Sequence, residues 1–153
     1  MNVLLLALLI SQNASITASN FCGGGVMSTC SPYGAIGEKI KDILYPNRSN
    51  DNYWNSGGYA PQYIQLEFAR EQSVSQIRLQ VAQTPKGHTS HKLLAGPQVN
   101  ELKEVKALAG FTSDHQWINM TFNPPLKSVR FLRINTITSL SWVAWFKVLV
   151  YKN

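Results

Sequence analysis

Charged side chains are scarce in this sequence: Asp, Glu, Lys and Arg together make up 14% of its 153 residues. The formal net charge is +6, but the positive residues are scattered and no run of Lys or Arg occurs. Nucleic-acid-binding proteins gather positive charge on one face or along one helix, so we do not expect a nucleic-acid partner.

Catalytic motifs are also absent. The sequence has no nucleophile elbow and no phosphate-binding loop, because Gly23-Gly24-Gly25 is not followed by a Lys and a helix. Glycoside hydrolysis needs two opposed carboxylates, and of the eight acidic residues only Glu67 lies near a recognisable motif. His88 and His91 lack a nearby third zinc ligand, with the exception of His115. We therefore expect a protein that is not an enzyme.

The N-terminal residues 1–19 have the pattern of a signal peptide. The apolar run Val3–Ile10 is too short to span a bilayer, and Thr17 and Ser19 are small residues spaced for cleavage before Asn20. Lys and Arg are missing from its start, and a buried N-terminal strand or helix is the alternative. The sequence thus predicts a secreted protein with one domain over residues 20–153.

Two cysteines, Cys22 and Cys30, follow this segment. In an exported chain an even pair at such short spacing predicts one local disulfide. Two free thiols, or half of a metal site, are the alternatives.

Alternating apolar and polar residues run through most of the remaining chain. In Tyr63–Phe68, residues Ile64, Leu66 and Phe68 share one face, which is the period of a half-buried strand. Gly, Pro and Asn separate such segments, and nothing alternates as β-α-β, so the pattern predicts an all-β antiparallel sandwich. The further predicted strands are Val74–Gln83, Lys92–Ala95, Trp117–Phe122, Val129–Thr136 and Ala144–Tyr151.

The segments between these strands are predicted to form a short helix, loops and turns. Ala35–Leu44 carries Ile36, Ile40, Ile43 and Leu44 at helical spacing, which predicts a short helix packed on the sandwich. Turn residues predict a loop over Thr84–Ser90 and a turn at Asn123-Pro124-Pro125. Asn100–Lys106 fits either a helical turn or an edge connection.

Three stretches resemble the discoidin-like domains, the coagulation-factor type C group of the galactose-binding-like fold. They are Trp54-Asn55-Ser56-Gly57-Gly58-Tyr59-Ala60-Pro61-Gln62-Tyr63-Ile64-Gln65-Leu66, Gln83–His91 and Ser141–Trp145. The resemblance extends from about residue 35 to residue 151 and implies a jelly-roll sandwich. Because the family is functionally diverse, the resemblance alone does not give the ligand.

Binding of a carbohydrate, of galactose type by analogy with relatives, is the function we predict. Sugars are held by an aromatic platform and by planar polar side chains that grip vicinal hydroxyls. The site would combine the Trp54–Gln62, Gln83–His91 and Thr138–Trp142 loops, and in sugar-binding relatives an aromatic near Trp142 stacks on the ligand. The predicted contacts are Asn55, Tyr59, Gln83, His88, His91, Arg133 and Trp142. Packing in the core is the alternative for Trp142, and a buried ion pair with Glu67 for Arg133; Trp54 and Trp145 are expected in the core.

The resemblance also implies a structural Ca²⁺ in the Pro46–Asn52 loop, where the family usually carries Asp-Gly. Asn47 and Asp51 are the candidate ligands. Calcium prefers several oxygens with carboxylate charge, and this pair, beside Arg48, makes a poor cage. No other cofactor is predicted.

Two other functions remain open. A membrane-surface module would insert Leu140 and Trp142 into anionic lipid while Lys86 and Lys92 meet phosphates. A protein-interaction or adhesion domain without a small ligand is the second alternative.

Overall fold

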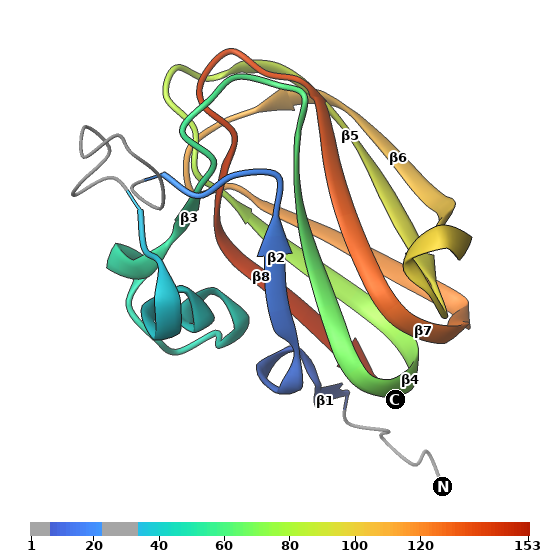
Figure 1. Ribbon diagram of the computed structural model, residues 1–153. Coiled ribbons are helices and arrows are strands. Elements are labelled where there is room, and N and C mark those ends of the chain that lie inside the picture. Colours follow the sequence, from blue (N-terminus) through green and yellow to red (C-terminus); the bar gives the residue numbers. More distant parts are fainter. Residues whose placement is uncertain (1–6, 23–33) are drawn as a thin grey trace, which may run out of the picture.

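The structure, a computed structural model, describes residues 7–22 and 34–153 (Figure 1). Antiparallel strands dominate it, and the helices of this part of the chain are short 3₁₀ segments. Its elements are β1 (Leu8–Leu9), η1 (Ser11–Asn13), β2 (Ser15–Ala18), η3 (Gly37–Leu44), η4 (Asn50–Asn52), β3 (Trp54–Asn55), β4 (Gln62–Val81), β5 (Gly87–Gly96), η5 (Val99–Glu101), β6 (Lys103–Thr112), β7 (Trp117–Thr138) and β8 (Ala144–Lys152). Among the described residues no helix is both long and apolar enough to cross a membrane.

Two long strands, β4 and β7, create the two layers of the sandwich. They pair with each other along both halves, and the register shifts between Glu67 and Gln76 mark the bend. Beyond the bend β4 pairs with β8, whereas its first half pairs with β2, and the second half of β7 pairs with β5. The strand order is β1-β8-β4-β7-β5-β6, with β2 on β4 and β3 on β8. The predicted antiparallel β-sandwich is confirmed.

The core lies between the layers. Ile64, Leu66 and Phe68 are at most 1% exposed, as their alternation predicts. Trp54 and Trp145 are paired across β3 and β8 and are both buried, so their predicted place in the core is confirmed. Burying aromatic side chains of this size removes a large apolar area from water.

The predicted strands are shorter than the observed ones. Tyr63–Phe68 and the predicted strand Val74–Gln83, as far as Val81, belong to one continuous strand, β4, and the predicted turn at Asn123–Pro125 lies inside β7. The ladder with β4 passes from Thr121 directly to Leu126, so the prolines stand where no donor to β4 is needed. The strand β6 was missed, because charged residues at its start obscure the alternation, and the predicted Thr84–Ser90 loop ends where β5 begins at Gly87.

The predicted helix near the N-terminus is the 3₁₀ helix η3. Ile40, Ile43 and Leu44 are buried, but Ile36 precedes the helix and is 48% exposed, so its prediction as part of the buried stripe is wrong. A 3₁₀ helix has three residues per turn, which brings Ile40 and Ile43 onto the same face.

Residues 8–18 pack on the sandwich. β2 pairs with β4 from Ser15 opposite Glu67 to Ala18 opposite Ile64, and the buried Ser11 hydroxyl donates to the Leu44 carbonyl at 2.9 Å. This arrangement matches the N-terminal strand that the sequence left as the alternative. Cleavage before Asn20 would remove both strands, and it stays a prediction. Cys22 is buried, while Cys30 lies outside the described residues, so the disulfide also stays a prediction.

Candidate functional site

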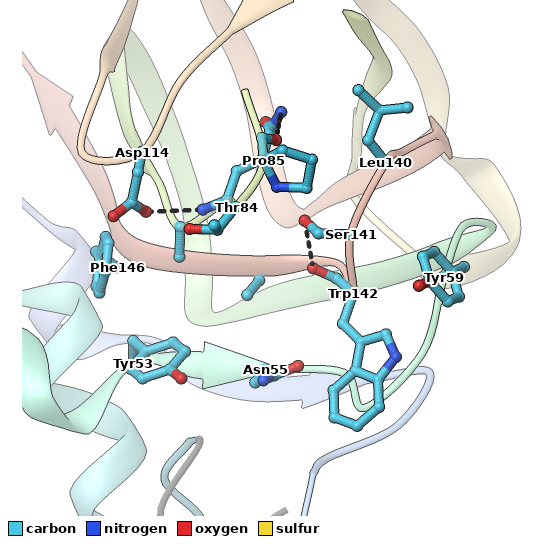
Figure 2. Close-up of a pocket in the computed structure, with 13 residues that line it drawn as sticks. Tyr53, Asn55, Tyr59, Thr84, Pro85, Asp114, Leu140, Ser141, Trp142 and Phe146 are labelled. Atoms are coloured by element: carbon cyan, nitrogen blue, oxygen red, sulfur yellow. Dashed lines mark hydrogen bonds between the residues drawn. The ribbon is translucent and has the colours of Figure 1, made fainter. Parts of the chain in front are cut away.

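Loops that connect the strands gather at the end of the sandwich where β4 and β8 begin (Figure 1). They enclose an open cavity of about 590 Å³, and Figure 2 shows the side chains around it. The cavity is lined by Tyr53, Asn55, Tyr59, Ala82, Gln83, Thr84, Pro85, Asp114, Leu140, Ser141, Trp142, Ala144 and Phe146.

One wall consists of the loop after β3 and the loop before β8, which are bound to each other. The Ser56 N–H donates to the Val143 carbonyl at 2.8 Å, and the Val143 N–H donates to the Gly58 carbonyl at 2.9 Å. The Asn55 side-chain oxygen accepts from the Gly57 N–H at 2.9 Å, in a left-handed turn that suits glycine. Its amide N–H groups have no partner in the described part of the chain.

The opposite wall is fixed by a network around Gln83. Its backbone N–H donates to Asp114 Oδ1 at 2.8 Å, and its Nε2 donates to the Pro85 carbonyl at 3.0 Å. Gln83 Oε1 accepts from the Thr112 hydroxyl at 2.6 Å. Gln83 is 7% exposed, so its side chain holds the loops and has little capacity left for a ligand.

Exposed apolar side chains surround the cavity mouth. Tyr59 is 62% exposed, Leu140 48% and Trp142 39%, and in Figure 2 the Trp142 indole lies between Tyr59 and Asn55. Tyr53 and Phe146 lie to the left of Asn55 in Figure 2, and their ring centroids are 5.2 Å apart. The mouth therefore offers flat aromatic faces to an incoming molecule.

The cavity carries little charge. Of the described residues that line it, Asp114 alone has an ionisable carboxylate, and it contacts His115 Nδ1 at 2.9 Å. The other polar groups are amides and hydroxyls. This lining suits a neutral polar molecule better than an anion.

Four of the predicted contact residues meet in this cavity: Asn55, Tyr59, Gln83 and Trp142. His88 lies instead on β5, with its side chain exposed outside the cavity lining.

His91 lies in the interior beneath the loops and is 7% exposed. Its ring nitrogens are hydrogen-bonded to the Thr136 and Thr89 hydroxyls at 2.9 and 3.1 Å, and its ring packs on Trp145 at 5.1 Å. Burial lowers the pKa of His91 to about 4, so the ring is neutral at pH 7. His91 is not among the residues that line the cavity, and its predicted contact with a ligand stays a prediction.

Arg133 lies on the sheet, away from the cavity. Its Nε donates to Gln65 Oε1 at 2.8 Å, and its guanidinium stands over the Tyr63 ring at 4.1 Å. The suggested pair with Glu67 is not formed, because Arg130 occupies that place at 3.4 Å.

Sequence reasoning missed Tyr53, Asp114 and Phe146. Asp114 stands in the turn between β6 and β7, and with β6 unrecognised nothing placed this turn at the same end as the predicted loops. Phe146 follows Trp145 by one residue, so alternation along β8 could have assigned it to the opposite face.

The Pro46–Asn52 loop does not fit a calcium ion. Asn47 and Asp51 are exposed, and the carboxylate of Asp42, which contacts this loop, is hydrogen-bonded to Arg48 and Asn52. In the described ranges no three His, Cys, Asp or Glu side chains cluster in a way that could hold a metal. Calcium prefers a set of several oxygens with carboxylate charge, and Asp51 is the one carboxylate within this loop.

The structure is thus a β-sandwich with a cavity at its loop end and exposed aromatic side chains beside it. The profile of the F5/8 type C domain matches residues 28–148, and the chain belongs to this family. No curated protein matches the sequence.

Solved structures of the same fold are distant in sequence. The family 32 carbohydrate-binding module of NanJ from Clostridium perfringens, in complex with galactose, has a TM-score of 0.71 at 12% identity, covering 96% of this chain and 100% of that one. The CpGH89CBM32-5 module of the same organism, in complex with GalNAc-β-1,3-galactose, has a TM-score of 0.70 at 13% identity, covering 96% and 100%. Discoidin II from Dictyostelium discoideum has 0.69 at 17%, covering 98% and 59%. At these identities the likeness establishes the fold.

Proposed function

We propose that the protein is a secreted, non-catalytic carbohydrate-binding module whose loop-end cavity takes a neutral sugar of galactose type. The observation that carries this proposal is the pair of exposed aromatic rings, Tyr59 and Trp142, beside a cavity lined by uncharged polar groups. Aromatic faces bind the apolar C–H face of a sugar, while amides and hydroxyls bind its hydroxyl groups. The fold shared with modules solved in complex with galactose and with GalNAc-β-1,3-galactose supports it.

Each contact has a separate task in this proposal. Trp142 stacks on the ring of the sugar, and Tyr59 covers its outer edge. The Asn55 amide N–H groups, which have no partner in residues 7–22 and 34–153, and the Ser141 hydroxyl bind hydroxyls of the sugar. Gln83 keeps the two loops of the opposite wall in place.

The negative charge of Asp114 favours neutral sugars over acidic ones. The carboxylate of Asp114 repels uronic acids and sialic acid, whereas it can accept hydrogen bonds from neutral hydroxyls. We therefore expect galactose and N-acetylgalactosamine to bind better than galacturonic acid.

Lipid binding receives weaker support. Leu140 and Trp142 are exposed near one another, as that function requires, but Lys92 is paired with Glu104 at 3.6 Å. Of the two predicted phosphate contacts this leaves Lys86, and one lysine contributes only about 1 kcal/mol at an anionic surface.

A glycan array combined with liposome sedimentation tests the proposal. We expect galactose-terminated glycans to bind and phosphatidylserine vesicles to leave the protein in the supernatant. Binding to the vesicles without any binding to glycans would refute the proposal in favour of a membrane-surface module.

A further inference from the structure

Lys147 is a buried lysine in the middle of β8. It is 2% exposed, although lysine is almost never buried this fully unless it is paired. Its Nζ donates to the backbone carbonyls of Asp42 and Arg48, both at 2.8 Å. One carbonyl near the end of η3 and one from the loop between η3 and η4 are therefore directed at one ammonium group.

Two charged side chains, Asp42 and Arg48, lie around this ammonium group. The Asp42 carboxylate accepts from Asn52 Nδ2 at 2.7 Å and from Arg48 Nη1 at 3.1 Å, and the Asn52 bond is the main cause that lowers the pKa of Asp42. Arg48 also lies over the Tyr45 ring at 3.5 Å. Burial lowers the pKa of Lys147, while the Asp42 carboxylate raises it. One anion, Asp42, and one further cation, Arg48, therefore act on the Lys147 ammonium.

We propose that the Lys147 ammonium occupies the cation position of the Asp42–Asn52 segment and makes a calcium ion unnecessary there. Backbone carbonyl oxygens are ligands that calcium uses, and here two of them already bind a positive group. A divalent ion entering the segment would meet Lys147 and Arg48, and it would find Asp42 already hydrogen-bonded. The Lys147 side chain of β8 holds the loop in place of a metal ion.

The two hydrogen bonds of Lys147 join β8 to the segment that leads into the cavity wall. η4 begins two residues after Arg48, and Tyr53 and Asn55 of the cavity lining follow it. A second bond, from Asn50 Nδ2 to Gln80 Oε1 at 3.2 Å, fixes the same segment on β4. Lys147 consequently positions the loop, independently of what the cavity binds.

Thermal unfolding with calcium and with chelator is the first test. We expect the wild-type midpoint to stay within about 1 °C on adding CaCl₂ or EDTA. Lys147→Met, which keeps the aliphatic chain but removes the donor, should lower the midpoint by roughly 5–8 °C. Lys152→Met on the same strand is the control, with a change under about 2 °C. A wild-type midpoint that falls in EDTA, or a Lys147→Met protein as stable as the control, would overturn the proposal.

Replacing the cation by a carboxylate is the second test. In Lys147→Glu the ammonium is gone and a new carboxylate stands beside two free carbonyls, which is the oxygen set that calcium prefers. We expect CaCl₂ to raise the unfolding midpoint of this variant by several degrees while leaving the wild type unchanged. If the variant is too unstable to isolate, refolding yield with and without CaCl₂ gives the same readout. A variant that does not respond to calcium contradicts a cation position at Lys147.

Discussion

His91 should make the stability of the protein depend on pH. Its pKa is about 4 in the folded protein, because burial disfavours the charged ring, and 6.5 when exposed. Between these values the unfolded chain binds a proton that the folded protein does not, so stability falls as the pH drops from 6.5 to 4. Each pH unit in that window corresponds to about 1.36 kcal/mol, which gives a total loss of about 3 kcal/mol.

Urea unfolding at pH 7.5, 5.5 and 4 measures this loss in wild type, His91→Gln and His88→Gln. His91→Gln keeps a planar polar side chain between the Thr89 and Thr136 hydroxyls, and it should lose much less stability on acidification. His88→Gln, at an exposed position, should follow the wild type. The reasoning fails if the wild type and His91→Gln lose the same free energy between pH 7.5 and 4.

Three further outcomes follow from the placement of single residues. Trp145→Ala should cost about 3–5 kcal/mol of folding stability, measured by thermal melts, because the indole is buried in the core. Cys22 and Cys30 should be bridged in the exported protein, a short loop closure worth roughly 2–3 kcal/mol; two alkylatable thiols in unreduced protein would contradict it. Amino-terminal sequencing of secreted protein should begin at Asn20, whereas a chain that retains residues 8–18 would show that β1 and β2 belong to the mature domain.

Strand alternation made the fold predictable. Ile64, Leu66 and Phe68 on β4 have the period of a strand buried on one face, and each is buried. The charged start of β6 hid a strand whose edge position tolerates charge. The predicted turn at Asn123–Pro125 lies inside β7, where these residues have no partner in the ladder with β4 but the strand continues on both sides.

The candidate site was only partly predictable. Tyr59 and Trp142 stand in loops rich in Ser, Gly and Pro, so their exposure could be inferred from local sequence. His91 has an equally polar sequence around it, yet its place on β5 turns it into the core. The role of Lys147 depends on the carbonyls of Asp42 and Arg48, which lie far from it in sequence. Local sequence patterns cannot predict such a contact.

Titration of Trp142→Ala with galactose-terminated glycans tests the central claim most directly. If the indole stacks on the sugar, affinity should fall by about 1–3 kcal/mol, which is roughly 5- to 150-fold. The melting temperature should change little, because a side chain that is 39% exposed leaves no closed cavity. Unchanged affinity, in a variant that still folds, would contradict carbohydrate binding at this cavity.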